Sequence, residues 1–246
     1  KVGARNAAVV ALTFPSTPLQ ARRGETVVTG LPLRAAIADL ASRRGDAAGA
    51  AQARREAAER LGVNPDAPTL LVTGGSLGAL HVNESMTGAA DALPEGAQVV
   101  HLTGRGKDEP VRAAVEAAGC SDRWHVIDYL TTMEDALAVA DLVVCRSGAG
   151  TVAEMEALGL PCIYVPLPIG NGEQRLNAAD HVAAGGAQLI DDKDFTADFV
   201  RSNVFPLLGS ARLADMTAAS QSLGRAGAAR ALADVALEQV KESGRE

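Results

Sequence analysis

Short apolar runs alternate with longer stretches of helical spacing over most of the chain after residue 68. The runs expected to form strands are 69–73, 98–103, 124–127, 141–145, 162–165 and 187–190. This alternation predicts an α/β fold in which a parallel sheet is wrapped by right-handed crossovers. After residue 191 no further strand is expected, and three helical stretches follow at 197–208, 211–223 and 226–242.

The first 68 residues have a different pattern. Two short strands are expected at 9–14 and 26–29, and an Ala- and Arg-rich helical stretch runs from residue 35 to Gly62. Two strands alone cannot form a domain, and the first residue is Lys, so the chain is expected to begin inside a larger protein. The expected divisions are an N-terminal remnant (1–34), a helical linker (35–68), a Rossmann-like domain (69–208) and C-terminal helices (209–246).

Composition excludes several classes of protein. Hydrophobic residues make up 47% and charged residues 22%, which is typical of a globular protein, and no apolar run approaches the length of a membrane span. The net charge of -7 disfavours nucleic-acid binding. Three cysteines without a CxxC pair indicate buried thiols rather than disulfides or a zinc site.

Two glycine-rich turns are the candidate binding elements. The first, 74–78 (GGSLG), and the second, 146–151 (RSGAGT), each lie between an expected strand and an expected helix. Such turns present backbone N–H groups and a helix dipole to an anion, so a diphosphate is a suitable ligand. Glu154, one turn further on, could accept hydrogen bonds from ribose. The alternative is that both turns only allow tight packing of strand against helix.

Three sharper interpretations compete for the first turn. A dinucleotide fingerprint requires GxGxxG, but Ser76 occupies the second glycine position. The turn also matches GxSxG, the nucleophile elbow of serine hydrolases, and Asp141 or Asp180 and then His181 follow it in the order of a Ser-Asp-His triad. However, His181 is expected within a helix. A nucleotide-sugar site uses both turns and also explains the polar, glycine-rich loop 166–174.

Three segments carry a resemblance to a known family. They are 71–83 (LVTGGSLGALHVN), 141–161 (DLVVCRSGAGTVAEMEALGLP) and 165–178 (VPLPIGNGEQRLNA). In order and spacing they resemble successive signatures of the MurG family of N-acetylglucosaminyltransferases. The resemblance extends upstream through residues 13–15 and 30–34, so it covers nearly the whole chain.

The resemblance implies two Rossmann-like domains of the GT-B type, of which this chain supplies the C-terminal, donor-binding one. It implies transfer of N-acetylglucosamine from UDP-N-acetylglucosamine to undecaprenyl-pyrophosphoryl-MurNAc-pentapeptide in peptidoglycan synthesis, with inversion and without a cofactor or metal. The enzyme is expected in the cytoplasm, peripheral on the inner face of the plasma membrane through its N-terminal domain. The catalytic base is also expected in the N-terminal domain, so this chain alone is expected to be inactive. The alternatives are a serine hydrolase with its GxSxG elbow at Ser76, and another UDP-sugar enzyme or a binding module of this fold.

Carried over by position, the resemblance places Arg34 and Ser76 near the diphosphate or uridine, and Leu130 and Met133 near the uracil. Glu154 would hold the ribose and Gln174 the sugar. The implied donor-binding residues are Arg34, Ser76, Leu130, Met133, Ala149, Gly150, Thr151, Val152, Ala153, Glu154 and Gln174. Glu173 departs from the Gln or His of the family, which puts its contact with the sugar in doubt.

Overall fold

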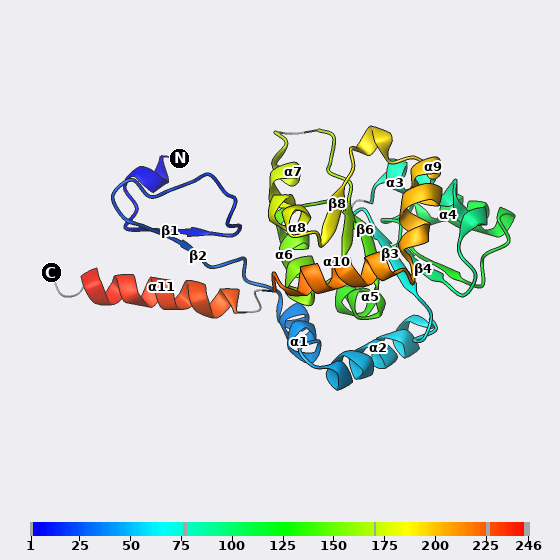
Figure 1. Cartoon of the computed structure of the whole chain (residues 1–246), viewed down its shortest axis with the longest axis horizontal. Helices are drawn as coiled ribbons and strands as arrows, with labels where there is room; N and C mark the ends of the chain where they lie inside the picture. Colours follow the sequence, from blue (N-terminus) through cyan, green and yellow to red (C-terminus); the bar gives the residue numbers. More distant parts are fainter. Residues whose placement is uncertain (1, 76–77, 170, 225–226, 244–246) are drawn as a thin grey trace.

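The computed structural model describes residues 2–75, 78–169, 171–224 and 227–243. Its centre is a six-stranded parallel sheet with the strand order β5-β4-β3-β6-β7-β8 (Figure 1). The strands are β3 (Thr69–Thr73), β4 (Gln98–Leu102), β5 (Trp124–Ile127), β6 (Leu142–Cys145), β7 (Cys162–Tyr164) and β8 (Ala187–Leu189). This arrangement confirms the predicted α/β fold with a parallel sheet.

Helices cover both faces of this sheet, which explains why its strands read as continuous apolar runs. All five residues of β3 are buried. Leu71 contributes to the core on one face, whereas Leu70 and Val72 contribute to the core on the other. The helices of the sheet region are α3 (Leu80–Thr87), α4 (Asp108–Ala117), α5 (Met133–Val139), α6 (Ala149–Leu158), α7 (Glu173–Asn177), α8 (Ala179–Ala183), α9 (Ala197–Phe199) and α10 (Ala211–Gln221).

The stretch expected as a linker forms two helices, α1 (Ala35–Arg43) and α2 (Ala47–Leu61), that pack on the sheet region. Ile37 and Leu40 of α1, and Ala57 and Ala58 of α2, are buried in the same core as β3 and β6. A break separates the two helices because Asp46 caps α2, its carboxylate accepting a hydrogen bond from the backbone N–H of Gly49 (2.8 Å).

The predicted continuous helix at 197–208 is interrupted. The chain passes from α9 into a π-helical segment, η4 (Val200–Val204), and then into a 3-10 turn, η5 (Phe205–Leu207). Pro206 explains the change, because proline lacks the N–H that a regular helix would need at this position. Short 3-10 turns also occur at η1 (Gly3–Arg5), η2 (Ala90–Ala92) and η3 (Asp192–Asp194).

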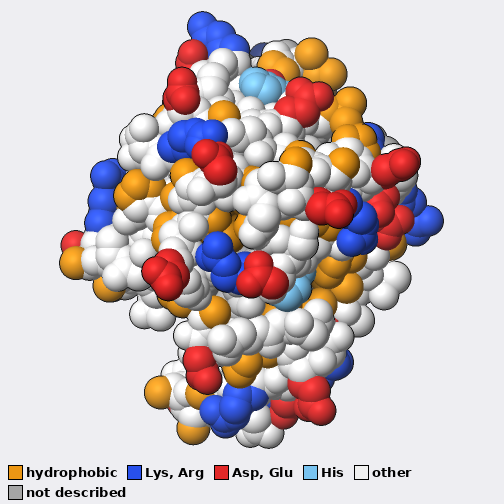
Figure 2. Space-filling view, turned by 90° about the vertical axis from the view of Figure 1, so that its right-hand side faces the viewer, with side chains coloured by type: hydrophobic (Ala, Val, Ile, Leu, Met, Phe, Trp, Pro, Cys, Tyr) orange, Lys and Arg blue, Asp and Glu red, His pale blue; other side chains and the backbone are white. Residues whose placement is uncertain are grey.

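The N-terminal segment forms a small parallel pair, β1 (Val9–Leu12) and β2 (Glu25–Val28). In Figure 1 this pair lies to one side of the sheet region, and the last helix, α11 (Ala228–Ser243), extends toward the same side. Phe14, just after β1, is buried in the core shared by α1 and α6. On the face shown in Figure 2, basic and acidic side chains are interspersed rather than gathered into a basic tract.

Candidate functional site

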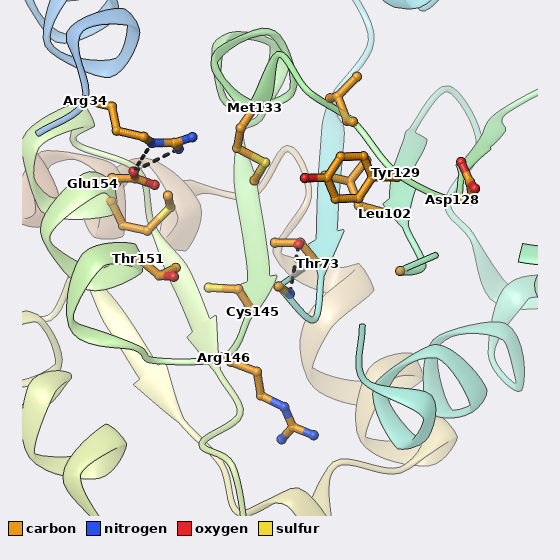
Figure 3. Close-up of a pocket in the computed structure, with 14 residues that line it drawn as sticks. Arg34, Thr73, Leu102, Asp128, Tyr129, Met133, Cys145, Arg146, Thr151 and Glu154 are labelled. Atoms are coloured by element: carbon orange, nitrogen blue, oxygen red, sulfur yellow. Dashed lines mark hydrogen bonds and ion pairs between the residues drawn. The ribbon is translucent and has the colours of Figure 1, made fainter. Parts of the chain in front are cut away.

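A cavity of about 230 Å³ opens at the carboxyl ends of β3, β4, β5 and β6 (Figure 3). The strand order changes direction between β3 and β6, and this topological switch point is where open α/β sheets bind ligands. The lining residues are Arg34, Thr73, Gly75, Leu102, Gly104, Asp128, Tyr129, Leu130, Met133, Cys145, Arg146, Thr151, Glu154 and Met155.

The N-terminus of α6 forms one wall of the cavity. Gly148 is the N-cap residue, and its carbonyl accepts the first helical hydrogen bond, from the N–H of Val152 (2.9 Å). The N–H groups of Ala149, Gly150 and Thr151 therefore have no partner within the helix and remain available to an anion. Thr151 and Glu154 are three residues apart and share the face of α6 that lines the cavity.

The first glycine turn follows β3 and approaches the same edge of the sheet. A Cβ atom on Gly74 would lie 2.2 Å from the backbone nitrogen of Ala79, and one on Gly78 would lie 2.1 Å from the carbonyl oxygen of Thr103. Side chains are therefore excluded at both positions, and Gly78 also has a positive φ of 67°. The predicted Ser76 lies outside the described residues.

Arg34 and Glu154 meet at the mouth of the cavity. The Nε and Nη2 atoms of Arg34 both donate to Oε1 of Glu154, at 3.1 and 2.9 Å. The Arg34 side chain is 58% exposed, whereas that of Glu154 is 16% exposed. Because Arg34 precedes α1 and Glu154 lies in α6, the pair joins two sequence-predicted ligands that are 120 positions apart in the chain.

The opposite wall is largely apolar. Leu130 and Met133 lie there, together with Leu102 at the end of β4. Tyr129 also lines the cavity, and the guanidinium of Arg105 lies 3.9 Å from the centre of its ring. A flat aromatic or heteroaromatic group is a suitable occupant of such a wall.

Gln174 lies at the start of α7, beyond the residues that line this cavity. Its Oε1 atom accepts a hydrogen bond from the backbone N–H of Leu167 (2.9 Å), which leaves the amide nitrogen as the group available to a ligand. Glu173, the uncertain position, is the first residue of α7. Asn177 donates from Nδ2 to the carbonyl of Ser147 and so links α7 to the second glycine turn (3.1 Å).

The structure thus brings together five of the predicted ligands and separates others. Arg34, Leu130, Met133, Thr151 and Glu154 share the cavity. Ala149 and Gly150 supply backbone groups in the first turn of α6, while the side chains of Val152 and Ala153 are buried. The roles of all these residues remain predictions.

Sequence reasoning missed several lining residues, above all Tyr129 and Arg146. Arg146 stood within a quoted motif, directly after an expected strand, and Tyr129 came two residues after another. Position at the carboxyl end of a strand was the signal that could have identified both.

The described residues do not support the hydrolase alternative. His181 is fully buried, with Nδ1 2.9 Å from the Tyr164 hydroxyl and Nε2 2.7 Å from the Ser220 hydroxyl. Asp141 lies at the opposite edge of the sheet, where its N–H donates to the carbonyl of Thr69, the first residue of β3. The other candidate, Asp180, accepts a hydrogen bond from the N–H of Ser16 (3.1 Å).

The described part of the chain contains no group of three or more His, Cys, Asp or Glu side chains placed to hold a metal ion. None of its helices has the length and apolar character required to cross a membrane.

Comparison with known proteins identifies the family. Residues 69–233 match the model of the glycosyltransferase family 28 C-terminal domain. The UDP-N-acetylglucosamine--N-acetylmuramyl-(pentapeptide) pyrophosphoryl-undecaprenol N-acetylglucosamine transferase of Bifidobacterium longum (strain DJO10A) is 46% identical over 99% of this chain and 65% of its own length. The relative of the same name from Paenarthrobacter aurescens (strain TC1) is 44% identical over 98% of this chain and 61% of its own length.

Among solved structures, the crystal structure of Acinetobacter baumannii MurG superimposes with a TM-score of 0.71 at 25% identity. The match covers 93% of this chain and 59% of that one. The chain therefore spans less than two thirds of the length of these relatives. The resemblance drawn from the three motifs is confirmed: the chain belongs to glycosyltransferase family 28, whose C-terminal domain it contains.

Proposed function

We propose that this chain is the donor-binding part of an inverting N-acetylglucosaminyltransferase of peptidoglycan synthesis. The donor would be UDP-N-acetylglucosamine, and the acceptor undecaprenyl-pyrophosphoryl-MurNAc-pentapeptide. The observation that carries the proposal is the convergence of the α6 N-terminus, Glu154 and an apolar wall in one cavity at the switch point of the sheet. The names of the relatives supply the identity of the two substrates.

In this proposal, the backbone N–H groups at the start of α6 and the Thr151 hydroxyl bind the diphosphate. Glu154 accepts hydrogen bonds from the ribose, while Leu130, Met133 and Tyr129 enclose the uracil. The amide nitrogen of Gln174 donates to a sugar hydroxyl. As the bond between sugar and diphosphate breaks, negative charge grows on UDP, and the fixed N–H dipoles of α6 stabilise it.

The acceptor reacts from the other side of the sugar. Direct displacement by the acceptor hydroxyl inverts the anomeric centre, and a general base must remove the hydroxyl proton. This chain spans only part of the length of its relatives. We propose that the remaining part holds this base, the acceptor site and the surface that meets the inner face of the plasma membrane. The donor half would supply binding and leaving-group stabilisation.

Glu154 offers a test of the proposed ribose contact. Glu154→Gln should weaken UDP binding about tenfold, because a charged acceptor is worth about 1.5–3 kcal/mol to a hydrogen bond. The loss should be smaller for 2′-deoxy-UDP, which lacks one of the hydroxyls. Isothermal titration calorimetry of the chain with both nucleotides measures this difference.

Two controls make the titration specific. Glu116→Gln changes an exposed carboxylate on α4 and should leave UDP affinity unchanged. NAD should not bind, because the first turn lacks the dinucleotide fingerprint. A folded chain that does not bind UDP would refute the proposed function. If Glu154→Gln loses the same affinity for UDP and for 2′-deoxy-UDP, the proposed contact between Glu154 and the ribose is wrong.

A further inference from the structure

Asp192 lies where three segments of the carboxyl edge of the sheet meet. It is the first residue of η3, just after β8, and its carboxylate forms an ion pair with Nη1 of Arg146, directly after β6. The other carboxylate oxygen lies 3.3 Å from Nδ1 of His81 in the first turn of α3. One carboxylate therefore connects the segments that follow β8 and β6 with the helix that follows the first glycine turn.

Arg146 extends this connection to the loop after β7. Its Nη1 atom also donates to the carbonyl oxygens of Val165 (3.0 Å) and Pro166 (3.1 Å). In Figure 3 the Arg146 side chain leaves the end of β6 in the direction away from Arg34 and Glu154. The guanidinium thus holds the base of the β7–α7 loop, defined as the described residues 165–169 and 171–172.

The β7–α7 loop depends on such tethers. Val165 and Pro166 are buried at its base, whereas residues 167–169 and 171–172 are exposed. Its second tether is the hydrogen bond from the N–H of Leu167 to the side chain of Gln174. Movement of the base would therefore move Gln174, the proposed contact with the sugar.

The Arg146–Asp192 pair is well shielded from water, since each side chain is only 14% exposed. Charge-assisted hydrogen bonds of this kind are directional and stronger than neutral ones. Without Asp192, Arg146 would be a largely buried cation beside the donor cavity, held only by two carbonyls. Its orientation toward the loop would then be poorly defined.

We infer that Asp192 is a positioning residue for the sugar end of the donor site. It fixes Arg146, and through Arg146 it fixes the β7–α7 loop with Gln174. This inference rests on the proposed function and adds to it a residue that neither the motifs nor the cavity lining contains. Its signature is selective: Asp192 contributes to the binding of UDP-N-acetylglucosamine but not to that of UDP.

The test compares the two ligands in the same variants. Calorimetric dissociation constants for UDP and UDP-N-acetylglucosamine are measured with the unmodified chain, Asp192→Ala, Asp192→Asn and Asp194→Asn. Asp192→Ala should raise the ratio of the UDP-N-acetylglucosamine constant to the UDP constant about tenfold. Asp192→Asn should raise it less, because the amide oxygen still accepts from Arg146. Asp194→Asn, an exposed change within the same 3-10 turn, should leave the ratio unchanged.

The remaining outcomes are separable. An unchanged ratio in both Asp192 variants, or equal weakening of the two ligands with a lowered melting temperature, would overturn the inference and leave the proposed function standing. An unmodified, folded chain that binds neither ligand would overturn both. If Asp192→Ala does not fold, Asp192→Asn provides the ratio by itself.

Discussion

Two buried histidines are held neutral by their surroundings. The Nδ1 atom of His101 accepts from the indole N–H of Trp124 (3.2 Å), so its Nε2–H donates to Oδ1 of Asn83 (3.0 Å). The Ser220 hydroxyl donates to the carbonyl of Gly186, which leaves its oxygen to accept from Nε2–H of His181. Burial lowers the pKa of His101 to about 3 and that of His181 to about 4.

These lowered pKa values predict loss of stability in mild acid. In the unfolded chain each histidine takes up a proton below its ordinary pKa of about 6.5, whereas in the folded chain it does not. The contribution of the two neutral histidines to the free energy of unfolding is therefore complete above about pH 6.5. It falls by about 1.4 kcal/mol per histidine for each pH unit below that, down to the folded pKa.

Urea unfolding between about pH 7.5 and pH 5 measures this loss. At about pH 7.5 the variant His181→Gln should be less stable than the unmodified chain, because the hydrogen bonds with Tyr164 and Ser220 are disturbed. It should also lose less stability on acidification, since one titrating group is gone. Identical slopes for the two proteins would contradict the assignment of the pH dependence to His181.

At the scale of elements, α2 is attached to the amino edge of the sheet through Arg54. Its guanidinium forms two hydrogen bonds of 2.9 Å with the carboxylate of Asp141, and it donates to the carbonyls of Pro65 (2.6 Å) and Ala67 (2.8 Å). A bidentate pair that also satisfies two carbonyls of the α2–β3 connection fixes the position of the helix. The side chain of Arg54 is 21% exposed and that of Asp141 is 36% exposed, so water screens the pair only in part.

We expect Arg54→Ala to lower the free energy of unfolding by about 2 kcal/mol, because it removes four hydrogen bonds that Arg54 donates to the Asp141 carboxylate and to the carbonyls of Pro65 and Ala67. Arg55→Ala, one residue further along α2 and exposed, should change it by less than about 0.5 kcal/mol. Urea denaturation measures both values. UDP affinity should remain the same in both variants, because the cavity lies at the opposite edge of the sheet; a loss in Arg54→Ala would show that the edges are coupled.

At the scale of the whole molecule, we expect donor binding without turnover and without a divalent cation. In the proposed site the diphosphate is met by the N–H groups of α6 and by the Thr151 hydroxyl, and the helix N-terminus supplies the positive potential that a metal ion would otherwise provide. Titration with UDP in the presence of EDTA should give the same affinity as in its absence; a tenfold loss would contradict the prediction. Transfer of labelled N-acetylglucosamine to the lipid-linked acceptor should not occur with this chain alone.

The parallel sheet and the position of the two turns could be predicted from the sequence. Each strand is a short apolar run, because it is buried on both faces, and each glycine turn stands at the end of such a run. The interrupted helix at 197–207 was not predicted, because the effect of Pro206 depends on how the chain around it packs. The break before α2 was missed because Asp46 is recognisable as a cap only once the helix is known to begin there.

The sequence by itself determined the fold class, because burial and tight turns restrict residue type locally. Its three motifs determined the family through their resemblance, and that resemblance also implied Arg34, Leu130 and Met133 as residues of the site. Only the tertiary structure decided that Arg34 pairs with Glu154 across 120 positions of the chain. The structure alone also joined Asp192 to Arg146, and placed Tyr129 in the cavity. These contacts depend on the order of the strands, which brings distant segments to one edge of the sheet, and strand order leaves no periodic signal in the chain.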